Sequence, residues 1–245
     1  MIFAQHMSHA LTAETPLPPS PSVDQKIQYE KLQQFRLCQS IRGEGIFMGL
    51  VQISYYQESA TRNDPKAKIF VVFAAPNDLT DCFGENILES YRKASTRISL
   101  LKGWHGHDGS TYINHRAFYR DLLLGHAEGK WVLAPRIFVD GTNDKGQKVR
   151  SKNMYDLRNV GDFRATFQKD DIETYKLPGH SGHTSIPGYP AQYLTGSSRT
   201  NKRNASTAWV VNFSNGKGRF RDNNELALTR ARYNCRPIRL VELIR

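Results

Sequence analysis

The sequence predicts an α+β domain, built from short twisted antiparallel strands, one or two helices and extensive ordered loops. Three observations lead to this fold class. Short β-like runs occupy residues 45–51 and 68–74, between polar segments. One well-patterned helix spans residues 114–124. Residues 177–198 are rich in Gly, Pro, Ser, Thr and His without a periodic apolar pattern, which is typical of a long loop.

The composition describes a chain that can bury a substantial core. Its 245 residues are 39% hydrophobic and 23% charged, which excludes a wholly disordered chain. No run approaches the roughly 20 apolar residues of a membrane-spanning helix. The first residues lack the basic and apolar segments of a signal peptide. We therefore expect the protein in the cytoplasm, or assembled on a phage particle or a cell surface by a non-standard route.

The chain begins with a proline-rich arm. Residues 16–22 read Pro-Leu-Pro-Pro-Ser-Pro-Ser, and each proline fixes φ and removes a backbone donor. We therefore expect residues 1–22 to form an extended, polyproline-like arm outside the core.

A helical lead-in and a hairpin follow the arm. Asp24 is placed to cap a helix over residues 25–37, within a lead-in of residues 23–42. The main domain then covers residues 43–245, and it starts with the two β-like runs, which we expect to pair as a hairpin.

The helix over residues 114–124 has both ends marked in the sequence. Asn114 can cap its start, apolar residues line one side, and Gly125 is placed to end it in a left-handed conformation. Residues 130–135 then read as a short buried strand that a proline stops. Residues 140–146 are rich in Gly, Asn and Asp and predict a further loop.

Two β segments are predicted near the C-terminus. Residues 208–213 read as a strand, and the Asn-Gly pair in the turn 214–217 is a strong hairpin signal. In that strand we expect Trp209 and Phe213 to face the core. Residues 236–243 form the closing strand, whose alternate residues face opposite sides.

The residue types that could support catalysis form no strong motif. Cys38, Cys82 and Cys235 are an odd number without C-x-x-C spacing, which favours small buried side chains over a disulfide framework or a zinc site. No nucleophile elbow, P-loop, dinucleotide-binding glycine motif or H-E-x-x-H motif is present. We therefore expect no enzyme activity and no cofactor.

Two histidine clusters raise the question of a metal. Residues 105–108 read His-Gly-His-Asp, with His115 nearby, and residues 180–183 read His-Ser-Gly-His. A structural zinc ion takes four ligands, and the glycines around each cluster favour a tight turn. We therefore expect no metal at either cluster, and a metal-dependent enzyme built on His105, His107 and Asp108 is the weakest alternative.

Motifs along the chain stand in the order found in a known family. Residues 193–198 read Tyr-Leu-Thr-Gly-Ser-Ser, residues 208–216 read Ala-Trp-Val-Val-Asn-Phe-Ser-Asn-Gly, and residues 233–241 read Tyr-Asn-Cys-Arg-Pro-Ile-Arg-Leu-Val. Together with residues 104–109 and 131–135, they resemble the C-terminal domain family of the Legionella collagen-like protein. The resemblance covers most of the main domain and implies the C-type lectin-like fold.

The C-terminal part is also similar to the variable proteins of diversity-generating retroelements. In those proteins a fixed strand framework presents a mutable surface, so the resemblance implies a ligand-binding surface on C-terminal turns. The residues that we expect to form it are all polar or charged: Arg199, Thr200, Asn201, Lys202, Arg203, Asn204, Lys217, Arg219, Arg221, Asp222, Asn223 and Asn224.

The charge of the chain favours an anionic partner. Lys and Arg number 34 against 23 Asp and Glu, and residues 197–245 alone hold 11 basic and 3 acidic residues. Arginine can hold a carboxylate, phosphate or sulfate group through two parallel hydrogen bonds. We expect a recognition protein that binds a macromolecular ligand, a protein or an anionic glycan, as in host attachment. The alternative is a basic nucleic-acid-associated or polyanion-binding protein, and a homo-oligomer is a further open alternative.

Overall fold

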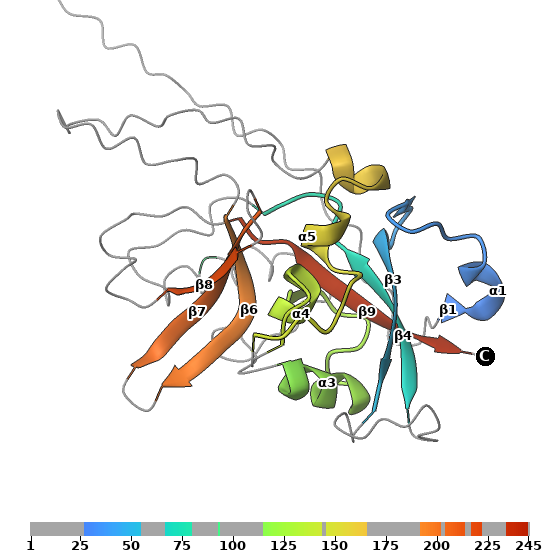
Figure 1. The fold of residues 1–245 in the computed structure, drawn as a ribbon. Coiled ribbons are helices and arrows are strands. Elements are labelled where there is room, and N and C mark those ends of the chain that lie inside the picture. The colour runs from blue at the N-terminus through green and yellow to red at the C-terminus, as the bar shows by residue number, and fades with distance from the viewer. Residues whose placement is uncertain are drawn as a thin grey trace, which may run out of the picture.

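The fold is α+β, as predicted, and contains two sheets (Figure 1). In the six-stranded sheet the strand order is β1-β9-β4-β3-β2, and β5 also pairs with β9. The second sheet has the order β6-β7-β8. The structure is a computed structural model that describes residues 27–54, 67–79, 93, 115–143, 146–165, 192–201, 204–213, 217–221 and 234–244. The predicted arm of residues 1–22 lies outside these residues.

A hairpin and the last strand form the middle of the six-stranded sheet. β3 (Gly45–Ile53) pairs antiparallel with β4 (Lys68–Ala74), which confirms the predicted hairpin. The closing strand β9 (Pro237–Ile244) pairs antiparallel with the other side of β4, with Val71 opposite Val241. Both faces of β4 and β9 are covered, so these strands are buried along most of their length.

Three short strands complete this sheet. β5 (Val132–Leu133) pairs antiparallel with β9 and confirms the strand predicted over residues 130–135. β2 (Ser40–Ile41) pairs with the start of β3, and β1 (Ile27–Gln28) pairs parallel with the end of β9.

The register of β3 shifts at a bulge. The shift lies between Phe47 and Leu50, and Gly49 inside it has a φ of 92°, which residues with a β-carbon rarely adopt. Leu50, directly after the bulge, is 37% exposed, whereas Phe47 before it is buried.

The prediction of a helix over residues 25–37 is wrong for most of its length. The helix α1 spans only Tyr29–Leu32, strand β1 precedes it, and turns follow it. Ile27 and the partly buried Leu32 and Phe35 pack in one cluster against the six-stranded sheet. Ile27 and Phe35 make these contacts from outside the helix, so packing against the sheet outweighs local helix propensity in this segment.

Short helices cover the other face of this sheet. They are α3 (His115–Leu123), α4 (Arg136–Val139), α5 (Met154–Leu157) and the 3-10 helix η1 (Gly161–Ala165). Their aromatic side chains Phe118, Phe138 and Phe163 are fully buried in the main core, together with Met48 and Val72 of the sheet. The N-terminal segment and these helices therefore sandwich the sheet (Figure 1).

Helix α3 confirms the prediction for residues 114–124. Gly125 follows it with a φ of 77°, and its N–H donates to the Leu122 carbonyl at 2.9 Å, so this glycine ends the helix as expected. Within the ranges that the structure describes, no helix has the length and apolar character needed to cross a membrane.

The second sheet lies in the C-terminal part of the chain. β6 (Gln192–Asn201), β7 (Asn204–Asn212) and β8 (Lys217–Arg221) pair antiparallel in this order, and β7 with β8 confirms the predicted hairpin. The prediction of a loop through residues 177–198 is wrong from Gln192 onward, since β6 starts there. Residues 177–191 lie outside the described part of the chain.

Candidate functional site

The second sheet carries seven of the twelve residues predicted to bind a ligand. The structure places these seven in strands and not on turns, because β6 and β7 pair as far as Asn201 opposite Asn204. The residues are Arg199, Thr200 and Asn201 in β6, Asn204 in β7, and Lys217, Arg219 and Arg221 in β8. The other five, Lys202, Arg203, Asp222, Asn223 and Asn224, lie outside the described residues.

Strand β8 brings three of the basic positions together. It pairs with β7 in an unbroken register, from Lys217 opposite Asn212 to Arg221 opposite Ala208. Lys217, Arg219 and Arg221 thus occupy alternate positions, about 6.6 Å apart along the strand. Among the described strands, β8 pairs with β7 alone, so these positions lie on the outer strand of the sheet.

One buried carboxylate ties the base of the second sheet to the six-stranded sheet. Oδ1 of Asp78 lies 2.6 Å from Nε of Arg236, just before β9, and Oδ2 accepts a 2.5 Å hydrogen bond from the Tyr193 hydroxyl of β6. The Asp78 and Arg236 side chains are 4% and 0% exposed. A charge-assisted pair shielded from water in this way holds its partners in a narrow range of geometries.

The backbone of β6 also lies directly against the segment after β5. The Gly196 N–H donates to the Ala134 carbonyl at 2.7 Å. A β-carbon at Gly196 would clash with the carbonyl oxygen of Leu133, so this close approach requires glycine. Thr195 beside it donates its hydroxyl proton to the Trp209 carbonyl at 2.9 Å, which links β6 to β7 inside the sheet.

Aromatic side chains fill the space beneath the second sheet. The Phe213 ring lies 4.1 Å from the Tyr193 ring and 5.6 Å from the Tyr155 ring, measured between centroids. Phe213 is buried, which confirms the prediction that it faces the core. Trp209 is only half-buried, and the Arg136 guanidinium covers its ring, with the guanidinium carbon 3.7 Å from the ring centroid.

Arg136 itself is fixed by two further contacts. Its Nε lies 2.9 Å from Oδ2 of Asp140, one helical turn later, and its backbone N–H donates to the Ser197 hydroxyl at 2.9 Å. The start of α4 and the middle of β6 are therefore joined directly, and the same arginine packs on the indole of Trp209 in β7.

Sequence reasoning did not single out Asp78, Arg136 or Gly196 as residues that position the site. The signal for Arg236 was present, since an arginine in a closing strand of apolar residues needs a carboxylate partner when it is buried. Nothing local in the sequence identifies Asp78 as that partner, because the two residues are 158 positions apart.

No metal site is found in the part of the chain that the structure describes. His105, His107, Asp108, His180 and His183 lie outside it, and His115 is the first residue of α3. The expectation that neither histidine cluster binds a metal therefore stays a prediction.

Cys38 and Cys235 form no disulfide and are fully buried, as predicted for packed thiols, and Cys82 lies outside the described residues. Burial, and to a lesser extent the carboxylate of Asp162, raises the pKa of Cys38 to about 11. Its thiol is therefore protonated at neutral pH and is a poor nucleophile.

Comparison of the chain with models of protein families, with curated proteins and with solved structures finds no match in any of the three.

Proposed function

We propose that this chain is a non-enzymatic recognition protein, in which a C-type lectin-like scaffold displays a ligand-binding surface around its second sheet. The observation that carries the proposal is strand β8, where Lys217, Arg219 and Arg221 occupy alternate positions of an outer strand. The sequence resemblance described above supports the scaffold, and the α+β architecture with two sheets and short helices agrees with it.

A rigid support beneath a variable surface is what such a recognition protein needs. The second sheet is fixed at its base by the Asp78 carboxylate, by the close approach of Gly196 and by the stacked Tyr193 and Phe213 rings. None of these contacts involves a residue of β8. This division supports a scaffold whose ligand specificity can change while its fold does not.

The charge points to the ligand class. Residues 197–245 contain 11 basic and 3 acidic residues, of which Arg236 and Arg239 are buried and paired with Asp78 and Glu44. The basic surplus that remains favours an anionic macromolecule as the ligand, a sulfated glycan or the acidic face of a protein. Arginines on a strand of fixed register hold sulfate and carboxylate groups at defined spacing, whereas mobile basic tails bind polyanions without selectivity.

Binding of the purified full-length protein to an array of sulfated and neutral glycans, with duplex DNA beside them, tests this function. We expect binding to a subset of the sulfated glycans at physiological salt. Arg219→Ala and Arg221→Ala should lose that binding. The uncharged changes Asn201→Ala and Asn223→Ala should alter which glycans are bound, since they change the surface and not the charge.

The rival account is a basic protein that binds every polyanion through its charge. It predicts equal binding to DNA and to all sulfated glycans, loss of binding with each basic residue removed, and no effect of the two asparagine changes. Binding that disappears for every ligand at moderate salt would establish this rival and remove the proposed function.

We propose further that the surface is diversified by a retroelement. The test is the genomic neighbourhood of the gene. A reverse transcriptase gene and a template repeat that matches the 3′ end of this gene would support diversification, and a neighbourhood without both would contradict it.

A further inference from the structure

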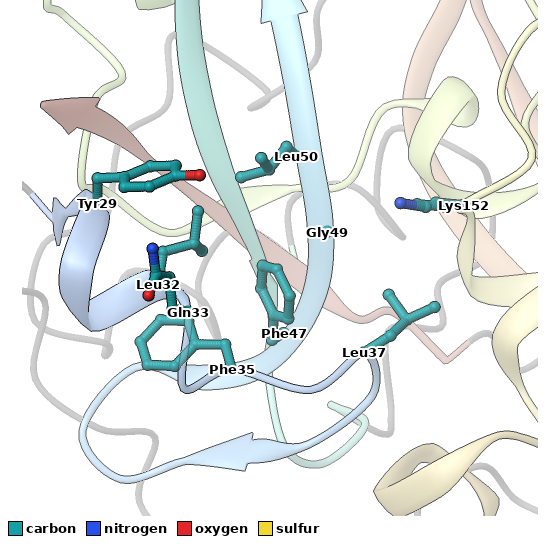
Figure 2. A pocket seen from close by; sticks show the side chains of 9 residues that line it. All are labelled: Tyr29, Leu32, Gln33, Phe35, Leu37, Phe47, Gly49, Leu50 and Lys152. Carbon is teal, nitrogen blue, oxygen red and sulfur yellow. The ribbon is translucent and has the colours of Figure 1, made fainter. Parts of the chain in front are cut away.

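An apolar groove lies on the side of the molecule that the N-terminal segment covers. It has a volume of about 380 Å³ and runs between α1 with the turn after it and strand β3. Figure 2 shows Tyr29, Leu32 and Phe35 on one side and Phe47 and Leu50 on the other. The edge-to-face pair of Phe35 and Phe47, with centroids 5.6 Å apart, forms its floor.

The groove exposes more apolar surface than the core around it. Tyr29 is 53% exposed, Leu37 38% and Leu50 37%, and these are three of the seven large apolar side chains that are exposed among the described residues. Gly49, within the bulge of β3, also lines the groove. A β-carbon there would lie 2.9 Å from Cδ of Lys152, so a larger residue at this position would displace the lysine stem. A groove of this volume lined by aromatic and aliphatic side chains is typical of a binding site.

Hydrogen-bond donors stand at the rim of the same groove. Figure 2 shows the Tyr29 hydroxyl and the Lys152 ammonium group at its two ends, with the Gln33 amide between α1 and the floor. Within the described residues, none of these three groups has a hydrogen-bond partner. Aromatic rings combined with free donors are the chemistry that recognises a polyproline II segment, which presents proline rings and unpaired backbone carbonyls.

We propose that residues 16–22 of this chain, Pro-Leu-Pro-Pro-Ser-Pro-Ser, dock in this groove in the polyproline II conformation. The segment contains two overlapping P-x-x-P patterns, Pro16 to Pro19 and Pro18 to Pro21. Its proline rings pack on Tyr29, Phe35 and Leu50, and its carbonyls accept from the donors at the rim. Docking in this way covers exposed apolar side chains of the groove, such as Tyr29 and Leu50.

The chain can reach the groove without strain. Residues 22 to 27 span up to about 17 Å when extended, whereas α1, which the segment must pass, is only about 6 Å long. So short a tether gives an effective concentration of roughly 1 mM. An affinity of about 0.1 mM for the free segment would then keep about 90% of the molecules docked.

Thiol protection in the full-length protein tests this docking. Ser20→Cys places a reporter inside the segment, and Ser8→Cys places one outside it in the same arm. Alkylation rates are followed by peptide-resolved mass spectrometry, so that the native cysteines do not interfere, and each rate is divided by its rate in denaturant. We expect Cys at position 20 to react about 10-fold more slowly than Cys at position 8, which is the protection that 90% docking gives.

Groove variants show whether the protection comes from this surface. Leu50→Asp should raise the rate at position 20 to that at position 8, and Tyr29→Ser should do the same if Leu50→Asp does not fold. The matched control is Leu124→Asp, which changes another exposed leucine, after α3, and should leave the protection unchanged. Equal rates at positions 8 and 20, or protection that survives both folded groove variants, would overturn the docking. Protection that disappears on dilution would also overturn it, because the occupant is then a second copy of the chain.

Discussion

Arg236 and Asp78 form a buried ion pair, with 2.6 Å between Nε and Oδ1, and the same carboxylate accepts a hydrogen bond from the hydroxyl of Tyr193. Asp78 lies just after β4, Arg236 just before β9, and Tyr193 in β6. One side chain thus joins both sheets. A buried charge whose partner is removed destabilises a fold far more than an exposed pair does.

We predict that Asp78→Ala lowers the free energy of unfolding by about 3–5 kcal/mol, because it leaves the Arg236 charge buried without its carboxylate. Tyr193→Phe removes only the hydroxyl and should cost about 1–2 kcal/mol. Urea denaturation of the two variants and the native protein measures both values. A loss below about 1 kcal/mol for Asp78→Ala would show that water or another side chain replaces the carboxylate.

Gly196→Ala should destabilise the protein by more than about 2 kcal/mol, since its β-carbon would meet the backbone carbonyl of Leu133, which cannot move without shifting β5. The control is Gly125→Ala, where space is open and only the positive φ is unfavourable, so about 1 kcal/mol is expected. Thermal denaturation ranks the two variants. Equal losses would mean that β6 moves away from β5 at little cost.

Phe213→Ala should cost about 3–5 kcal/mol, because the ring is buried between Tyr193 and Tyr155. Trp209→Ala should cost less, despite the larger ring, because Trp209 is only half-buried. Chemical denaturation tests this order. A larger loss for Trp209 would assign the main packing of β7 to the side on which Arg136 lies.

The stability of the segment around β2 should depend on pH through Asp162. Its Oδ2 accepts the Ser40 N–H at 2.6 Å, and this hydrogen bond holds the pKa of the carboxyl below its usual value. A carboxyl with a lowered pKa in the folded state stabilises the protein at pH values above its ordinary pKa, about 4, and loses this effect as the pH falls through the folded-state value.

Asp162→Asn should therefore melt at a lower temperature than the native protein near pH 6, and the two curves should converge as the pH approaches about 2. Melting temperatures of both proteins across this range provide the measurement. A constant difference at all pH values would show that the contact with Ser40 does not depend on the charge of Asp162.

Local patterns in the sequence were sufficient for elements whose ends carry their own signals. Helix α3 lies within a few residues of its prediction because Asn114 and Gly125 mark its limits, and β7 and β8 flank the predicted Asn-Gly turn. The lead-in failed for the opposite reason. Ile27 is strand and not helix because it pairs with Leu243 at the far end of the chain, a contact that no local pattern encodes.

The candidate site was also predictable only in part from the sequence. The basic residues of the second sheet are visible in the sequence as a concentration of charge, but their position on strands depends on pairing between β6 and β7. Residues 192–198 lack an apolar alternation, since Tyr193 and Leu194 are neighbours and are both buried. Such a strand, covered on both faces, resembles a loop when only its composition is considered.

The parallel pairing of Ile27 with Leu243 places the start of β1 and the end of β9 at the same edge of the six-stranded sheet. β1 is the first described strand and β9 the last, and they are neighbours in the six-stranded sheet. Figure 1 shows the second sheet on the side of the molecule opposite to the end of β9. A partner joined at the end of β9 would lie on the side of the molecule away from β8. β1 and β9 are parallel neighbours. A force that pulls the start of β1 away from the end of β9 would therefore load all their hydrogen bonds in shear at once and would not break them one by one.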